Sequence, residues 1–459
     1  MKRSTFQAII FSILIIIVSA VISVVFIMDH QLKGLGYTTE QIARFKQYEI
    51  QDKVHTYNPA LLKALNSDAF DRNNLDYYIL FESDEDVTRD INDLAKKYTF
   101  DGFSRLHTIL SNDEMLSLVF MDRISDLDTF IKIKEHGYDL QNAYKAMEQV
   151  PKSFLQHFLV SPVYSQRFLD CYIKLANNGY SYSFIDYVHG NYDDDLSEFI
   201  ASFRYFEVLE ELIQTEGFKL ENTPRYLWYK NRYASYENTK IVANVNANKD
   251  IPSSINYSDL YNNSIVVTSP DPFYVLVNKQ HRLSDDYQPP ELVSIDAEYR
   301  GSNTPVNAEV LAAFKEMADA YLQSHTERLI IQDGYIPFSA QQELYESTLA
   351  ELTEVDEENT IIDTFLARAG YSEHQTGMAV NVTEKGTSIY NLEGTETAEW
   401  LEKNASSYGF ILRYPKGRDF ITGYSYIPYQ YRYVGRLNSQ MINRLSWTYE
   451  EFYYMLIGE

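Results

Sequence analysis

The sequence has little cysteine and relatively few basic residues, and both shortages exclude classes of protein. Cys171 is the one cysteine among 459 residues, so the chain builds no internal disulfide framework and no thiolate-rich zinc cluster. Lys and Arg together number 40 against 65 Asp and Glu, which gives a formal net charge of −25. Because binding to nucleic-acid phosphates requires a basic surface, we expect no nucleic-acid partner. Hydrophobic residues make up 45% of the chain, enough for packed cores.

Long apolar runs are scarce too, and the one that is present lies near the N-terminus. Residues 8–28 are apolar apart from small serines, and they follow the basic residues Lys2 and Arg3. As a helix this run spans about 30 Å, the hydrocarbon thickness of a bilayer. A cleaved signal peptide is the alternative, but its apolar core is usually only about 7–15 residues long. The run therefore predicts an uncleaved, single-pass anchor in the cell membrane. Residues 1–29 would form the cytoplasmic N-terminus and the membrane helix, with the later domains extracellular.

Residues 30–224 carry a recurring pattern that predicts an all-α, helical-repeat region. Glycine followed by an aromatic residue stands between helix-forming stretches at Gly36, Gly102, Gly137, Gly179 and Gly217. A left-handed glycine ends one helix, and Ser, Thr or Asp then caps the next, as in the capping-box spacing of Thr38 and Gln41. A period of about 35–40 residues indicates stacked helix pairs. Such a region either binds a partner on a concave surface or lifts the C-terminal domain off the membrane, and the sequence leaves both interpretations open.

Residues 225–459 are expected to form a single α+β domain, with residues 225–270 as a lead-in segment. Runs rich in β-formers and bounded by Pro and Gly predict strands at Ile265–Val267, Tyr274–Val277, Leu329–Ile331, Met378–Val382 and Tyr424–Tyr426. Apolar residues at helical spacing predict one helix over Asn307–Ser324 and another from Ala398 toward Tyr408.

Several motifs of this C-terminal domain occur in an order typical of one family. Ser372–Val382 reads SEHQTGMAVNV and resembles the Ser-x-His-x-x-Gly-x-Ala-x-Asp signature of the VanY-type D-alanyl-D-alanine carboxypeptidases, zinc peptidases of bacterial cell walls. Tyr408–Gly417 and Pro428–Gly435 are similar to the following blocks of that family. Asp333–Tyr335 and Gln341 stand upstream in the family's order, with Asp333 where the family has Ser. The resemblance covers the whole C-terminal domain and implies a zinc-peptidase-type fold with a small antiparallel sheet.

The same resemblance implies a zinc site whose ligands and catalytic groups are mostly replaced in this chain. In the family, zinc is bound by the His and the Asp of the first signature and by a His in the last block. A Glu three residues before that His acts as general base, and an upstream Arg stabilises charge on the substrate. The ligand positions hold His374, Asn381 and Gln430, the base position holds Ile427, and the Arg position holds Ile336. Amide oxygens are poor zinc ligands and isoleucine accepts no proton, so we expect no bound cofactor and no intact catalytic residue.

The main hypothesis is a membrane-anchored, catalytically inactive VanY-like protein that binds a peptidoglycan stem peptide or a cell-envelope protein. The retained residues Gln341, Ser372, His374 and Tyr431 are expected to line its ligand-binding cleft. The alternative is an active zinc D-alanyl-D-alanine carboxypeptidase that trims stem peptides through a different set of ligands. Acidic residues near the motifs, such as Glu373, are expected to be surface charges.

Overall fold

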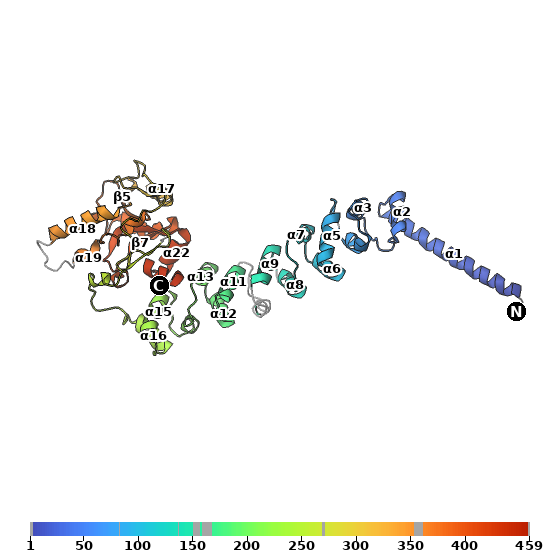
Figure 1. Ribbon diagram of the computed structural model, residues 1–459, viewed down its shortest axis with the longest axis horizontal. Coiled ribbons are helices and arrows are strands. Elements are labelled where there is room, and N and C mark those ends of the chain that lie inside the picture. Colours follow the sequence, from blue (N-terminus) through green and yellow to red (C-terminus); the bar gives the residue numbers. More distant parts are fainter. Residues whose placement is uncertain are drawn as a thin grey trace. The chain divides into compact units, whose positions relative to one another are not determined.

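The computed structural model describes residues 3–81, 83–135, 137–149, 157, 168–268, 271–352 and 361–457, with side chains from residue 13 onward (Figure 1). The chain forms two compact units, Met1–Leu169 and Asp170–Glu459. Lys2, one of the two basic residues expected to hold the N-terminus inside the cell, lies outside the described residues.

The first unit is helical throughout its described part. Its first helix, α1 (Arg3–Gly34), includes the segment Ile13–Gly34, which has a mean hydropathy of 2.5 and is exposed from Ile13 to Ile27, whereas Leu32 near its end is buried. Among the described residues it is the one helix long and apolar enough to cross a membrane. The shorter elements that follow are α2 (Thr39–Tyr48), α3 (Pro59–Ala64), η1 (Arg72–Asn74), α4 (Leu75–Leu80), α5 (Thr88–Lys97), α6 (Phe100–His107), α7 (Asn112–Ser117), α8 (Leu127–Glu135) and α9 (Leu140–Gln149).

Four of the five glycines expected to end helices adopt the left-handed backbone. Their φ angles are +98° at Gly36, +89° at Gly137, +96° at Gly179 and +82° at Gly217. The expectation was wrong for Gly102, which lies inside α6, where an added Cβ would come 3.0 Å from Leu127 Cδ1 of α8. Close helix packing therefore explains this glycine. The capping box is confirmed, because Gln41 N donates to Thr38 Oγ1 (3.3 Å) and Thr38 N donates to Gln41 Oε1 (2.8 Å). The stacking of these helices as sequence repeats stays a prediction.

The second unit begins with further helices, and they pack against its C-terminal end. The helices are α11 (Leu169–Asn177), α12 (Tyr182–Asn191), α13 (Asp194–Ala201), α14 (Leu209–Leu212), η3 (Leu220–Asn222), α15 (Thr223–Arg232) and α16 (Asn238–Asn246). Trp447 Nε1, between α22 (Arg436–Leu445) and α23 (Tyr449–Leu456), donates to Glu221 O (2.8 Å), and its ring centroid lies 5.8 Å from that of Phe199. Such contacts join these helices to the C-terminal helices within the second unit, and the domain boundary after residue 224 stays a prediction.

A four-stranded antiparallel sheet forms the centre of the second unit. Its strands follow in the order β5 (Leu329–Asp333), β6 (Ala379–Glu384), β8 (Ile427–Tyr433) and β7 (Phe410–Tyr414). The described part also contains a parallel pair and an antiparallel pair of two-residue strands, β1 (Ile265–Val266) with β2 (His281–Arg282) and β3 (Leu292–Val293) with β4 (Val306–Asn307). The remaining helical elements are η4 (Asp259–Tyr261), α17 (Ala308–Leu322), α18 (Phe338–Leu352), α19 (Ile362–Phe365), η5 (Glu373–Thr376), η6 (Ile389–Asn391), α20 (Glu396–Asn404), η7 (Ala405–Tyr408) and α21 (Asp419–Thr422).

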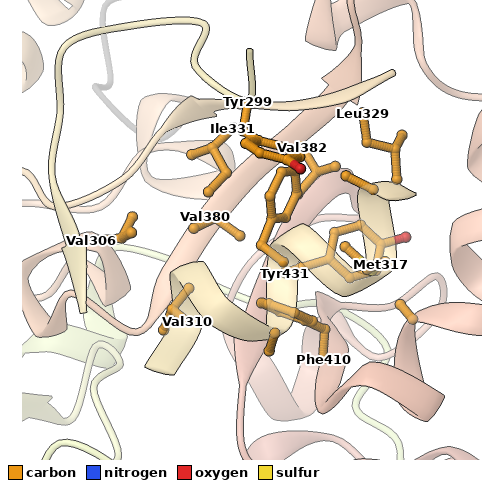
Figure 2. Close-up of a cluster of buried hydrophobic side chains, with 14 of the residues drawn as sticks. Tyr299, Val306, Val310, Met317, Leu329, Ile331, Val380, Val382, Phe410 and Tyr431 are labelled. Carbon is orange, nitrogen blue, oxygen red and sulfur yellow. The ribbon is translucent and has the colours of Figure 1, made fainter. Parts of the chain in front are cut away.

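One face of this sheet and helix α17 enclose a hydrophobic core of the second unit (Figure 2). Val380 of β6, Phe410 of β7 and Tyr431 of β8 are at most 1% exposed and pack in one cluster with Val310 and Met317 of α17. Successive residues of a strand point to opposite faces of a sheet. The residues beside these core positions on β6 and β8 therefore point to the face away from α17.

The expected α+β class is confirmed, and most expected elements are present. The two predicted helices correspond to α17 and to α20 with η7. Two predicted strands were wrong, because Tyr274–Val277 and Tyr424–Tyr426 lie outside any strand. Their backbone groups bond within turns, to neighbouring loops and to side chains. Val275 N donates to Asp271 O (2.7 Å), Ser425 N donates to Thr364 O (2.8 Å), and Val277 O accepts from Arg413 Nη2 (3.4 Å). Val275, Val277 and Tyr424 are buried there without strand pairing.

Candidate functional site

Three polar residues stand in a row across the face of the sheet that points away from α17. The strand register places Asn381 of β6 opposite Asp333 of β5 on one side and opposite Gln430 of β8 on the other. Directly opposed residues have Cβ atoms about 4.5–5.5 Å apart and share a face of the sheet. Asn381 Nδ2 donates to Asp333 Oδ2 at 3.0 Å. Two of the predicted ligand positions, Asn381 and Gln430, are thus neighbours in space.

His374, the third predicted ligand position, comes from the short helix η5. Its Nδ1 lies 2.7 Å from Gly334 O, and because a carbonyl oxygen only accepts, Nδ1 carries the hydrogen and Nε2 keeps its lone pair. Burial lowers the pKa of His374, although the charge of Asp333 and the carbonyl of Gly334 act in the opposite direction. Gly377 ends η5 with φ +71°, and an added Cβ there would come 3.0 Å from Leu292 Cδ2.

A cavity of about 370 Å³ brings most of the predicted site residues together. Its lining includes Ile336, Gln341, Ser372, His374, Asn381, Ile427 and Gln430. Gln341 is buried in this lining, and its Nε2 donates to Ala367 O (2.7 Å), another lining residue. The two isoleucines predicted to stand at the base and arginine positions therefore lie in the same cavity as the three predicted ligand positions.

Tyr431 does not belong to this cavity, and the expectation that it lines the cleft was wrong. Its side chain is 1% exposed and packs in the core between the sheet and α17 (Figure 2). Tyr431 pairs with Val380, while the preceding residue Gln430 pairs with Asn381, so the alternation of the strand directs the tyrosine to the other face. Tyr431 supports the fold and not the cavity.

A buried cluster of charges holds η5 in place. Glu373, expected to be a surface charge, is fully buried, which corrects that expectation. Its carboxylate accepts from Arg413 Nε (2.6 Å) and pairs with Arg432 Nη1, while Arg413 Nη2 also pairs with Glu450 Oε1 (2.6 Å). Burial alone would raise the pKa of Glu373, but the two arginines hold it below its usual value. Because Glu373 precedes His374 directly, this cluster fixes the position of the imidazole.

The residues present do not fit a catalytic zinc ion. Zinc sites in peptidases use three ligands drawn from imidazoles and carboxylates, whereas this cavity offers one imidazole, His374, and two carboxylates, Asp333 and Glu373. Both oxygens of Glu373 are already paired with Arg413 and Arg432. Asp333 is already bonded to the amide of Asn381, and the amide oxygens of Asn381 and Gln430 suit hard cations better than zinc. Within the described ranges, His, Cys, Asp and Glu form no group of three or more that could hold a metal ion.

Asp333 and Tyr429 also line the cavity, and neither was predicted from the sequence as a site residue. In the motif comparison Asp333 stands where the family has Ser. That comparison does not show that Asp333 lies at the end of β5 opposite Asn381 of β6, because this depends on the strand register. Tyr429 lines the cavity, and burial, the neighbouring Tyr390 and the charge of Asp333 together raise the pKa of Tyr429 to about 12. The sequence did offer one signal for Asp333, because a charged residue just after a predicted apolar strand is a candidate site residue.

Comparisons with known proteins agree with these motifs. Residues 303–436 match the family described as VanY, D-alanyl-D-alanine carboxypeptidase. The chain is 31% identical over 194 residues to the putative carboxypeptidase YodJ of Bacillus subtilis (strain 168), a match that covers 41% of this chain and 69% of that protein. It is 34% identical over 185 residues to the bifunctional D-Ala-D-Ala dipeptidase and D-Ala-D-Ala carboxypeptidase VanXYC of Enterococcus gallinarum, covering 39% of this chain and 92% of that one.

A solved structure is similar to part of the chain. The LdcB LD-carboxypeptidase shares 30% sequence identity, with 42% of this chain and 91% of that chain covered and a TM-score of 0.38. The family match spans β5, β6, β7 and β8, the four strands that carry the cavity. Through this C-terminal domain, the chain belongs to the VanY family of D-alanyl-D-alanine carboxypeptidases.

Proposed function

We propose that this chain is a membrane-anchored member of the VanY family that binds a peptidoglycan stem peptide without hydrolysing it. One observation carries the proposal. Ile427 and Ile336, at the positions of the general base and the substrate-binding arginine, line the same cavity as His374, Asn381 and Gln430. The cavity therefore keeps polar side chains that can bind a ligand. At positions 427 and 336, however, isoleucine can neither accept a proton nor bind a substrate carboxylate.

Magnitudes support the absence of turnover. A general base contributes about 10²–10⁴ to the rate of a reaction, and Ile427 cannot supply that step. A four-ligand structural zinc site binds with about 10–16 kcal/mol, or about 3–4 kcal/mol per ligand, so weak donors at Asn381 and Gln430 cost on the order of 5 kcal/mol or more. This corresponds to some thousands-fold in zinc affinity. The two losses together would reduce hydrolysis to the background rate.

The proposed location follows from α1. Its apolar segment Ile13–Gly34 is long enough to cross a bilayer and is exposed from Ile13 to Ile27, and an exposed apolar surface of this length is unfavourable in water. We propose that α1 anchors the chain and that the cavity faces the cell wall outside the membrane. The helices of residues 30–224 would then act as a spacer or bind a cell-envelope protein.

The test uses the full-length chain purified in detergent micelles. We expect sub-stoichiometric zinc by metal analysis, no release of D-alanine from a stem pentapeptide, and saturable binding of the same peptide by isothermal titration calorimetry. Gln430→Leu should weaken this binding, because Gln430 lines the cavity. Gln342→Leu, on the exposed side of α18 and outside the cavity lining, is the matched control and should leave binding unchanged. One zinc ion per chain together with sustained D-alanine release would show that the chain is an active carboxypeptidase.

A further inference from the structure

The charge of the cavity is unusual for a site that would receive a peptide carboxylate. Asp333 lines the cavity and forms no ion pair with any described Lys, Arg or His. The other carboxylate of the lining, Glu373, is neutralised by Arg413 and Arg432. The cavity lining contains no Lys or Arg, and the position of the family's arginine is held by Ile336. Asp333 is thus the one uncompensated charge of the described lining, and it is negative.

The neighbours of Asp333 add hydrogen-bond acceptors. Asn381 uses its Nδ2 to donate to Asp333, and its Oδ1 is buried without a hydrogen-bond partner in the described part of the chain. Asn381 is only 9% exposed. A buried acceptor without a donor costs about 1–3 kcal/mol, so a ligand that brings an N–H group to this oxygen recovers that energy. Gln430, opposite Asn381 and 8% exposed, lines the same cavity and can contribute its own amide oxygen.

The walls of the cavity suit an aliphatic stem that ends in a cation. Ile336 and Ile427 supply apolar surface for methylene groups. Tyr429 and Tyr390 also line the cavity, with ring centroids 5.9 Å apart in an edge-to-face arrangement. Tyr390 is 80% exposed, so its ring is available at the cavity mouth. Aromatic faces attract ammonium groups, and aliphatic stems pack on apolar surface while their charged ends stay at polar atoms.

We propose that this cavity binds a primary ammonium group on an aliphatic stem, the side chain of a diamino acid in a stem peptide, with Asp333 as its counter-ion. Asn381 Oδ1 and the Gln430 amide oxygen accept the remaining N–H groups. This inference rests on the proposed binding of a stem peptide and names the part of the peptide that is recognised. This site would thus select a cation. A site that contains an arginine and a zinc ion would instead select a carboxylate.

The test compares two peptides on the full-length chain in detergent micelles, by isothermal titration calorimetry at low salt. One is a stem pentapeptide with a free side-chain amine, and the other is the same peptide with that amine acetylated. We expect acetylation to weaken binding to the unaltered chain at least ten-fold. Asp333→Asn should remove this preference, with the two peptides binding within two-fold of each other. Asp286→Asn removes an exposed charge outside the cavity lining and should keep the preference.

The outcomes separate this inference from the proposed function. Equal binding of both peptides to the unaltered chain would overturn the ammonium site while leaving stem-peptide binding intact, and this comparison does not depend on the folding of any variant. Binding of neither peptide would overturn both proposals. Saturable binding of calcium chloride alone that is lost in Asp333→Asn, with no preference for the free amine, would identify a metal-ion site and refute the ammonium site. Release of D-alanine would overturn only the proposed absence of hydrolysis.

Discussion

Restoring the family's ligands should restore zinc binding, because the backbone already places the three positions together. The change is Asn381→Asp with Gln430→His. Asn381 and Gln430 are register partners on adjacent strands, and Nε2 of His374 keeps its lone pair. Two regained ligands are worth on the order of 5 kcal/mol or more, or some thousands-fold in the dissociation constant for zinc.

Asp333 would oppose the substitution Asn381→Asp. Its Oδ2 lies 3.0 Å from Asn381 Nδ2, so an aspartate at position 381 would face a second carboxylate. Two like charges at this distance disfavour ionisation of one of them and destabilise the metal-free protein. The variant should therefore also carry Asp333→Ser, which introduces the residue that the family has at that position.

The assay is a titration of each variant with zinc chloride. Calorimetry measures the dissociation constant for zinc, and thermal unfolding measures the gain in stability. At a zinc concentration of about 100 times the dissociation constant, binding adds about 2.7 kcal/mol to the free energy of unfolding. Gln430→His alone and Gln342→His on exposed α18 are controls that should gain little. A triple variant that is folded but binds no more zinc than the unaltered chain would show that the three side chains do not converge, and the correspondence of motifs would be wrong.

Three further predictions concern the scaffold around the cavity. Glu373→Gln should lower the free energy of unfolding by about 3–5 kcal/mol in denaturant titrations, because it leaves the buried Arg432 without its carboxylate and Arg413 with Glu450 alone. Burial raises the pKa of Glu451 from 4.5 to about 7, so the folded chain keeps a proton that the unfolded chain releases. The resulting stability is complete below about pH 4.5 and is lost as the pH rises through 7, and urea unfolding of Glu451→Gln should lack this pH dependence. Gly377→Ala should cost about 1–3 kcal/mol through its φ of +71° and its close contacts, whereas Gly386→Ala, with φ +87° and open space around it, should cost less in the same unfolding assay.

The sequence was most informative where local rules decide the structure. Helix α17 has apolar residues at helical spacing and an Asn307 side chain that accepts from Glu309 N, so its limits could be predicted closely. The left-handed glycines at Gly36 and Gly179 follow from the same local chemistry. The motifs placed His374, Asn381 and Gln430 in one site because their order along the chain resembles a known family.

The sequence was least informative where the answer depends on pairing between distant segments. The charge of Glu373 is neutralised by Arg413 and Arg432, which lie far away along the chain, so its burial has no local signal. The facing direction of Tyr431 and the membership of Asp333 in the cavity both depend on strand register. A shift of one residue in register would exchange the two faces of a strand, and no pattern within one strand fixes the register.

The alternation of strands β6 and β8 has a consequence for how such a protein changes over time. Val380 and Tyr431 belong to the core, while the adjacent residues Asn381 and Gln430 belong to the cavity. Mutations at the second pair leave the packing of the first pair untouched, so the chemistry of the pocket can drift without a penalty in folding. A lineage can in this way abandon one reaction and acquire another specificity while inheriting the same architecture unaltered.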